Sequence, residues 1–398
     1  MMLVIERPGR GTSLARLATG WVFFANGAAF GSWVPHIPDA KHALELSDSM
    51  LGFALLGMAV GSLLGLPISG VLTSRFGSRK TATAAIFALL LATPLPLAAP
   101  NLPLFVIALA LLGTANGAVD VAMNAHAVVV EQRFGRPIMS GLHALFSAGG
   151  LAGAAAAGLA MSAGLSPQVH LLVIVAGLLV ATLAAVSFLL PIVPSAIRRT
   201  RFRVPRGPLL WLGVLTMCAL MAEGAIGDWA AVYLRDDLRS DPALAALGFA
   251  AFSLAMAAGR FGGDNMVRRY GGPAVLASGA GTAAMLLAAS LLLSSPIAAL
   301  LGFAAVGLGL ANAVPILFST AGKIHGTPPE LAIAAVSTAG YCGFLFGPPV
   351  IGLAAERLCL GMALGLVAGA LAVVALGAAY AITEGAENRW MVSSNGWK

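Results

Sequence analysis

Long apolar runs alternate with short polar segments along the whole chain. Each run holds about 20 or more mostly apolar residues, the length that a helix needs to cross the hydrocarbon core of a bilayer. No stretch shows the two-residue alternation of a half-buried strand. The pattern predicts an all-α membrane protein with twelve transmembrane helices. The expected spans are 14–37, 50–74, 80–99, 102–130, 138–163, 169–190, 209–234, 243–267, 273–294, 297–322, 331–355 and 361–383.

The composition agrees with lipid as the main solvent of this chain. Hydrophobic residues make up 59% of the 398 residues and charged residues only 10%, whereas soluble domains average ~25% charged residues. So few charges cannot cover a water-facing surface. The three cysteines, Cys218, Cys342 and Cys359, form no CxxC pair. We therefore expect neither a disulfide framework nor a metal–thiolate site.

The positive charges indicate how the chain lies in the membrane. Eighteen of the 23 Lys and Arg residues fall on one side of the expected spans and four on the other, and Arg260 lies inside the span 243–267. The positive-inside rule makes the richer side, with both termini, cytoplasmic. The net charge of +7 is then a topology signal, and we expect no nucleic-acid partner. The basic N-terminus leads into a retained first helix, with a signal peptide as the alternative.

Short motifs return at nearly one offset. Four pairs echo one another: residues 31–33 and 227–229, 51–54 and 247–250, 115–116 and 311–312 at an offset of 196, and 75–77 and 269–271 at 194. They predict two parallel six-helix halves. We expect the halves at 1–190 and 209–383, a basic cytoplasmic linker at 191–208 and a cytoplasmic tail at 384–398.

Two acids interrupt the apolar span 209–234. Glu223 lies near its middle and Asp228 nearer its expected periplasmic end. A carboxylate so deep cannot face lipid, so Glu223 must face a cavity or a partner. Desolvation disfavours its charged form, which suits a proton-coupling site. The alternative for Glu223 is a protonated structural hydrogen bond, and for Asp228 a capping or gating role.

The span 102–130 carries a polar stripe. Asn116, Asp120 and Asn124 are spaced i, i+4 and i+8, so they share one helix face. Asp120 has no Lys or Arg within a turn, and we expect it to bind a proton or the substrate. The alternative is a structural contact with a neighbouring helix. Asn26 and Asn312 carry the same amide group as Asn116 and Asn124. An amide both donates and accepts, which suits a hydroxyl-rich or zwitterionic solute or hydrogen bonds between helices.

Other polar side chains complete the set of candidates. His143 is a proton-relay candidate because histidine titrates near neutral pH, and Tyr341 is a candidate cavity hydroxyl. No spacing supplies a third ligand for a metal, and no nucleophile accompanies the acids. We therefore expect no cofactor, no metal and no enzymatic activity. Trp33 and Trp229 are expected in an interfacial aromatic belt.

One loop motif carries a family resemblance. The stretch GVLTSRFGSRK at 70–80 resembles the signature GxLaDRxGRK of major facilitator transporters, and 259–271 is its counterpart in the second half. Residues 120–150, 223–234 and 337–352 resemble a bacterial inner-membrane branch of the YbjJ and MosC type, related to fucose-permease-like symporters. The resemblance implies a central cavity lined by the first, fourth, seventh and tenth helices.

The resemblance also implies gating residues at the cytoplasmic loops. These are Arg75, Gly77, Arg79, Asp264 and Arg269. The family's acid is replaced by Ser74, so we expect Asp264 to carry more of the cytoplasmic closure. Gly347 and Pro348 make the span 331–355 a bent, closely packed hinge.

We expect a secondary active transporter of the bacterial inner membrane that acts as a monomer by alternating access. The favoured function is proton-coupled symport of a small polar solute such as a sugar, a polyol or a related amine. The alternative is proton-coupled efflux of small drugs or metabolites. Efflux antiporters of this superfamily commonly carry an arginine in the fourth helix, and none occurs between Leu102 and Val130.

Overall fold

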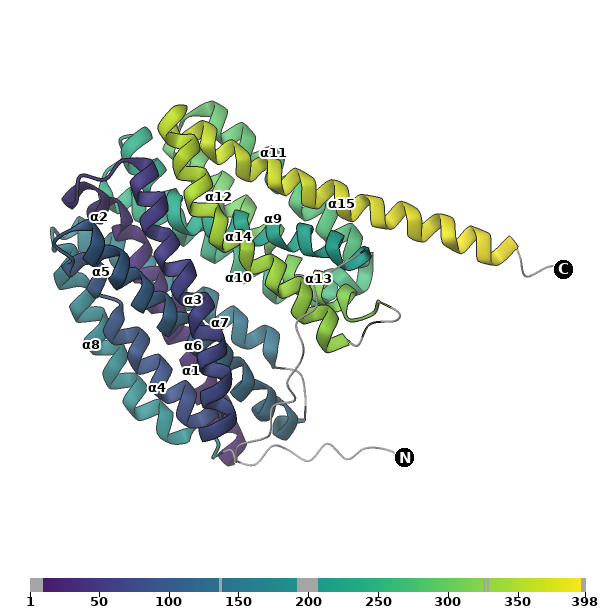
Figure 1. Ribbon diagram of the computed structural model, residues 1–398, viewed down its shortest axis with the longest axis horizontal. Coiled ribbons are helices and arrows are strands. Elements are labelled where there is room, and N and C mark those ends of the chain that lie inside the picture. Colours follow the sequence, from purple (N-terminus) through teal and green to yellow (C-terminus); the bar gives the residue numbers. More distant parts are fainter. Residues whose placement is uncertain (1–9, 136–137, 192–206, 325–326, 328, 395–398) are drawn as a thin grey trace.

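The computed structural model describes residues 10–135, 138–191, 207–324, 327 and 329–394. In these residues the chain forms helices and no strand (Figure 1). The first half contains α1 (Arg10–Trp33), η1 (Val34–His36), α2 (Ile37–Ala43), α3 (Asp48–Phe76), α4 (Ser78–Ala92), α5 (Leu95–Ala98), α6 (Leu102–Phe134), α7 (Met139–Ser162), α8 (Pro167–Ala185) and η2 (Val186–Phe188). The second contains α9 (Pro208–Val232), η3 (Tyr233–Asp237), α10 (Pro242–Tyr270), α11 (Gly272–Leu293), α12 (Pro296–Leu310), α13 (Ala313–Ala321), α14 (Pro329–Arg357) and α15 (Leu360–Ser394).

The expected all-α membrane architecture is confirmed. Among the described residues, 11 helices are long and apolar enough to cross a membrane. The helix α1 is not one of them, because its polar residues lower its hydropathy, yet its 24 residues pack lengthwise on α7. It therefore supplies the twelfth membrane helix. The orientation of the termini stays a prediction, and α15 continues past 383, through much of the expected tail.

Two expectations about local structure need correction. The expected loop after the first span contains the short helix α2. A proline lies in its first turn, where proline is favoured. The two tryptophans lie in the interior rather than in an interfacial belt. Trp33 is 1% exposed and Trp229 is fully buried, because neighbouring helices cover both of them.

The two halves repeat one arrangement of helices. The helix α1 packs on α7 as α9 packs on α14, and α3 packs on α6 as α10 packs on α12. Both α3 and α10 have 29 residues, start with a capping oxygen from Ser47 or Asp241, and end at a glycine. These glycines, Gly77 and Gly271, have φ of 82° and 85°, which a side chain would disfavour.

Small residues let paired helices approach closely. In α6, a side chain at Gly113 would meet the backbone carbonyl of Met58 in α3. In α14, Gly343 stands in the same way against Met217 of α9. Such contacts between backbones are the usual means of helix association in membranes, where no hydrophobic effect drives it. They fix the relative positions of the helices that carry the polar side chains.

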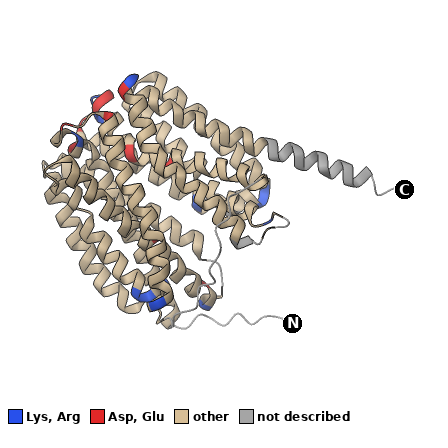
Figure 2. Cartoon of the chain, viewed as in Figure 1, with Lys and Arg blue, Asp and Glu red and all other residues tan. Residues whose placement is uncertain are grey.

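The two halves meet mainly along α3 with α14 and α7 with α10. Figure 1 shows the halves side by side, diverging toward the end where both termini lie. We call this the termini end, and the opposite one, where α2 and η3 lie, the latch end. Figure 2 shows acidic and basic residues together at the latch end, whereas basic residues predominate near the termini.

The expected gating residues of the termini end make contacts within their own halves. Arg79 Nη2 donates to the carbonyl of Ser187 at 3.1 Å. Arg75 and Arg269 each lie 5.3 Å from the ring of the next residue, Phe76 or Tyr270. The hydroxyl of Ser74 donates to Val71 of its own helix at 2.8 Å. The side chain of Asp264 lies outside the described residues, so its larger share of closure stays a prediction.

The hinge candidates of α14 lie at its contacts with other helices. Gly347 packs against Met221 of α9, and the carbonyl of Pro348 faces Gly52 of α3. The helix continues through Pro348 and Pro349. Pro348 therefore contacts the first half, whereas Gly347 contacts a helix of the second half, to which α14 itself belongs.

The close packing of α3 on α6 yields a first prediction. We expect Gly113→Val to lower the free energy of unfolding by ~1–3 kcal/mol or more, because its side chain would overlap the carbonyl of Met58. Gly177→Val on α8 is the matched control, since no neighbouring atom lies within 4 Å of a side chain there. Thermal unfolding in detergent measures both. Equal shifts for the two variants would contradict the packing described.

Candidate functional site

A cavity of about 260 Å³ lies between the two halves. This size is near the lower end of the ~300–1,000 Å³ that drug-sized ligands occupy. Its lining comes from α1, α3, α6 and α7 of the first half and from α9, α10 and α14 of the second. A small solute in this cavity would touch both halves at once.

Asp120 is held at the cavity by donors from both halves. Asn124, one turn along α6, donates from Nδ2 to Oδ1 of Asp120 at 3.1 Å. The hydroxyl of Tyr341 on α14 donates to Oδ2 at 3.1 Å. The carboxylate therefore accepts two hydrogen bonds, one of which crosses between the halves. The polar stripe lies on one face as its spacing predicts, with Asn116 and Asp120 in the lining.

Glu223 lines the cavity beside Arg260 of α10. Its Oε1 lies 4.0 Å from Nη2 of Arg260. Nη1 of Arg260 donates to the hydroxyl of Ser147 on α7 at 2.8 Å, and lies 3.5 Å from the carbonyl of His143. This arginine thus connects an acid of the second half to the first half. The sequence shows a lone arginine within an apolar span, and that signal points to a functional site.

The amide oxygen of Asn26 is buried without a hydrogen-bond donor in the described part of the chain. Asn26 is 2% exposed and lines the cavity from α1. Its Nδ2 lies 3.7 Å from Sδ of Met123, a weak acceptor. Its Oδ1 is buried and has no hydrogen-bond partner in the described part of the chain. A buried acceptor of this kind favours a donor from a ligand or a water molecule.

Three expected site residues lie outside the lining. Asn312 stands at the break between α12 and α13 and donates to the carbonyl of Gly259 at 3.2 Å. Asn124 acts on Asp120, as described above. The ring of His143 packs edge-on against Phe23, with centroids 5.2 Å apart. No residue of α12 or α13 is among the described lining residues, which differs from the expectation that the tenth helix faces the cavity.

Aromatic rings form much of the remaining wall. The centroids of Phe30 and Phe249 lie 5.7 Å apart and those of Phe249 and Phe252 5.8 Å apart. Phe146 and Phe344 also line the cavity. The wall therefore combines aromatic faces with a few polar groups, which is the usual composition of a ligand site.

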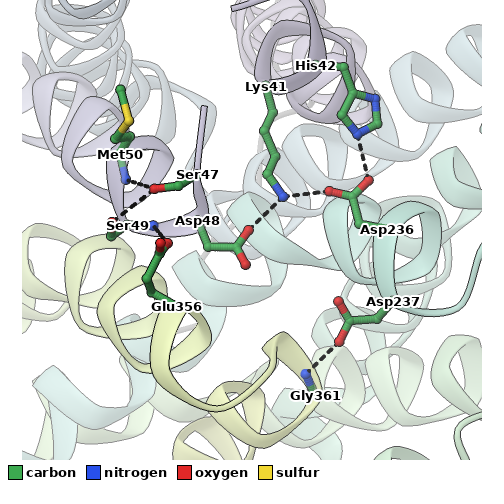
Figure 3. Close-up of polar contacts among 10 residues, drawn as sticks. All are labelled: Lys41, His42, Ser47, Asp48, Ser49, Met50, Asp236, Asp237, Glu356 and Gly361. Atoms are coloured by element: carbon green, nitrogen blue, oxygen red, sulfur yellow. Dashed lines mark hydrogen bonds and ion pairs between the residues drawn. The ribbon is translucent and has the colours of Figure 1, made fainter. Parts of the chain in front are cut away.

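A cluster of charges joins the halves at the latch end (Figure 3). Lys41 Nζ lies 2.6 Å from both Asp236 Oδ2 and Asp48 Oδ1, and His42 Nε2 lies 2.9 Å from Asp236 Oδ1. Arg235 pairs with Asp39. We call these side chains the latch. They comprise Asp39, Lys41, His42 and Asp48 of the first half and Arg235 and Asp236 of the second.

The latch residues of the second half lie on one turn of π-helix, which is wider than an α-helical turn. The segment η3 is a π-helix that continues α9, and such turns are frequent at functional sites. It directs Arg235 and Asp236 to the first half, while Asp237 accepts from the backbone N–H of Gly361 at 3.1 Å. A further bond between the halves runs from the N–H of Ser49 to Glu356 at 3.2 Å.

Asp39 and Lys41 of the latch have shifted pKa values. Burial raises the pKa of Asp39, but the hydrogen bond with His36 and the charge of Arg235 outweigh it and set the pKa below its ordinary value. Burial lowers the pKa of Lys41, but Asp236 and Asp48 outweigh it and set the pKa above its ordinary value. Both side chains therefore stay charged across the neutral range.

Comparison with known proteins supplies the family. The profile of the Major Facilitator Superfamily matches residues 19–330. The chain belongs to this superfamily. It is 38% identical, over 91% of its length and 94% of the relative's, to an uncharacterised MFS-type transporter of Yersinia pestis. It is 35% identical to the membrane protein MosC of Rhizobium meliloti, over 89% of this chain and 87% of that protein.

Solved structures of the superfamily share the fold. The nucleoside transporter NupG matches with a TM-score of 0.68 at 13% identity, over 92% of this chain and 98% of that one. The xylose transporter XylE from E. coli, in a partially occluded inward-open conformation, matches with a TM-score of 0.66 at 14% identity, over 92% and 97%. The present chain is thus a multi-pass membrane protein with the fold of MFS transporters.

The latch yields a second prediction. We expect Asp39→Asn and Arg235→Met each to increase reagent access from the latch end, and the double variant to increase it no further. The two residues form one pair, so the interaction energy should be ~0.5–3 kcal/mol. The readout is the labelling rate of Ser253→Cys by a membrane-impermeant thiol reagent, in a protein without its native cysteines. Multiplicative effects of the two substitutions would show that they act independently.

The shifted pKa of Asp39 yields a third prediction. A lowered pKa means that its pairing stabilises the latched state above the ordinary aspartate pKa of ~3.9 and is lost as the pH falls through the lowered value. The ratio of labelling rates between Asp39→Asn and the parent should therefore be constant from about pH 5 to 8. It should begin to fall near pH 4 and reach one only when the pH lies below the lowered pKa of Asp39. A ratio that changes within the neutral range would contradict this assignment.

Proposed function

We propose that this chain is a proton-coupled symporter that takes up a small polar organic solute such as a sugar, a polyol or a related amine. The observation that carries the proposal is the hydrogen bond from Tyr341 to Asp120, which joins the two halves at the wall of the central cavity. Alternating access requires the halves to move about such a cavity. A carboxylate that bridges them is placed to sense both the proton and that movement.

Protonation of Asp120 would change the bond between the halves. As a carboxylate, Asp120 accepts from both Asn124 and Tyr341. A protonated carboxyl has an O–H that donates and a hydroxyl oxygen that accepts less strongly, so at least one of the two bonds weakens or reverses its direction. Proton uptake at Asp120 would therefore favour a different arrangement of α6 and α14. This is the coupling that a symporter needs, because a ligand shifts only an equilibrium whose states it binds differently.

Glu223 supplies a second carboxylate whose partner is already charged. Arg260 lies within ion-pair distance of it and also donates to Ser147 of the first half. Protonation of Glu223 would remove the charge that attracts Arg260, and Arg260 would keep its hydrogen bond to Ser147 of the first half. We propose that one of the two acids carries the coupled proton and the other responds to the solute. The backbone carbonyl of His143 lies 3.5 Å from Nη1 of Arg260, and we propose for His143 a supporting role in proton transfer.

The remaining features agree with uptake into a bacterial cell. We propose that the termini end is cytoplasmic, as the Lys and Arg distribution predicts, and that the latched state faces inward across the inner membrane. The named cargoes of NupG and XylE are a nucleoside and a xylose, and they support a hydroxyl-rich solute for this chain. We propose a monomer, because each chain contains both walls of its cavity.

The fourth prediction separates the two acids. Asp120→Asn and Glu223→Gln should give two phenotypes. One variant loses uphill accumulation and its pH dependence but keeps counterflow exchange, because exchange needs no net proton movement. The other loses binding. Proteoliposome uptake under an imposed pH gradient, with counterflow in parallel, measures both.

The control for these variants is Glu45→Gln, which removes an exposed carboxylate outside the cavity lining and should behave like the parent. If both cavity variants accumulate solute like the parent, the two carboxyls are structural and the proposed mechanism fails. Export of solute against its gradient from loaded vesicles would support proton-coupled efflux instead.

A further inference from the structure

One acid of the cavity lacks the partner that the other two have. Asp120 accepts from Asn124 and Tyr341, and Glu223 faces Arg260. Asp228 also lines the cavity. In the described part of the chain it has neither a hydrogen bond nor an ion pair from another side chain. An uncompensated carboxylate inside a membrane protein is costly, so its partner should come from outside the chain.

Two aromatic rings of the cavity lining approach α9 at the residue before Asp228. The preceding residue, Gly227, is the point on α9 where two rings approach. A side chain at this position would lie 3.8 Å from Phe30 of α1 and 3.9 Å from Phe249 of α10. The two rings meet edge to face, at an angle of 67°. Phe30 and Phe249 thus come from different halves and converge on the turn of α9 that carries Asp228.

This combination selects the charge of a ligand. Aromatic faces attract cations through the ring quadrupole, most strongly where water is excluded. They offer nothing to an anion, and a carboxylate repels one. The cationic side chain of the lining, Arg260, is already engaged by Glu223 and Ser147. The part of the cavity beside Asp228 therefore disfavours a ligand with a negative charge and favours one with a positive charge.

A second buried group of the same cavity lacks a partner. Oδ1 of Asn26, on α1 one turn before Phe30, is buried and accepts no hydrogen bond. It is a pure acceptor, so it can be satisfied only by an N–H or O–H donor. An ammonium group and hydroxyl groups are donors of this kind. The unpaired acid and the unpaired amide oxygen point to the same class of ligand.

We propose that Asp228, Phe30 and Phe249 form a subsite for a protonated amine, and that the transported solute is a small polar organic cation. The inference rests on the proposed function, since it selects the amine from the three solute classes named there. Asp228 supplies the counter-charge and the two rings enclose the ammonium group. Asn26 accepts from the ammonium or from a neighbouring hydroxyl. No covalent step is involved.

Matched pairs of probes test the charge directly. Choline and 3,3-dimethyl-1-butanol have nearly the same shape and differ in charge, and glucosamine and glucose differ in one amine. Thermal-shift titrations of the purified full-length protein measure apparent affinities. We expect choline or glucosamine to bind at least about tenfold more tightly than its neutral counterpart. Equal affinity within both pairs would overturn the proposal, and so would the failure of both choline and glucosamine to bind.

Substitutions connect this preference to the subsite. Asp228→Asn should abolish the preference for the charged probe, and Asp228→Glu should restore part of it. Phe30→Leu should weaken choline binding roughly fivefold while affecting the neutral alcohol less. Glu45→Gln, which removes a carboxylate outside the cavity lining, should match the parent. A full charge preference in Asp228→Asn would overturn the assignment.

The outcome also separates this inference from the proposed function. Amine binding that depends on Asp228, without accumulation of the amine under a pH gradient, would sustain the subsite and refute proton-coupled symport. Proton-coupled accumulation of glucose with no preference for glucosamine would do the reverse. A loss of pH dependence in Asp228→Asn with unchanged binding of both probes would make Asp228 a proton site and overturn the amine subsite.

Discussion

Polar atoms inside a bilayer must find partners within the protein, and this requirement decides where the chain places its few polar groups. Within each half, many polar side chains meet this requirement by bonding to a backbone carbonyl. The amide of Asn312 donates to the carbonyl of Gly259, and the hydroxyl of Ser62 to that of Gly113. Several buried polar atoms of the described residues remain without a partner, and one of them, Oδ1 of Asn26, belongs to the lining of the central cavity. The carboxylate of Asp228 also lines the cavity. Asn26 and Asp228 therefore give the cavity two polar groups that can bind something other than the protein.

The latch shows how two similar halves become complementary. Asp39 and Arg235 are separated by 196 positions, the same offset that relates the sequence motifs of the two halves. They are therefore equivalent positions, facing each other where the halves meet. Two identical charged residues there would repel, so a joined pair requires that the halves differ in sign. The same offset relates Lys41 to Asp237, the neighbour of its partner Asp236. Divergence between the repeats thus produced the contact that closes this end.

The sequence was sufficient for the spans and for the polar stripe, because both depend on local spacing. Helical periodicity places Asn116 and Asp120 on one face, and the structure brings both to the cavity. What the spacing could not reveal is the rotation of a helix about its axis or a break within it. Asn312 therefore matched Asn116 in the repeat but faces α10, at a break between α12 and α13. Pro315, which has no N–H to donate to the carbonyl of Ala311, is the sequence signal for this break. The crossing bond from Tyr341 to Asp120 joins residues 221 apart, and only the packing of the halves determines it. Arg260 was visible as a lone charge, but its partners on α7 and α9 were not.

The two ends of the molecule hold the halves together with different strength. The latch combines several partly buried pairs at one end, each worth about 0.2–1 kcal/mol in such positions, so that opening it costs a few kcal/mol in total. At the other end, Ser74 bonds within its own helix where the family carries an acid. Among the described residues these contacts favour the latched state. A ligand would reverse this preference only if it bound the alternate state better by a similar amount, because equal binding to both states shifts nothing. Groups that can supply such a difference must contact both halves, and the side chains around Asp120, Arg260 and Asp228 do so.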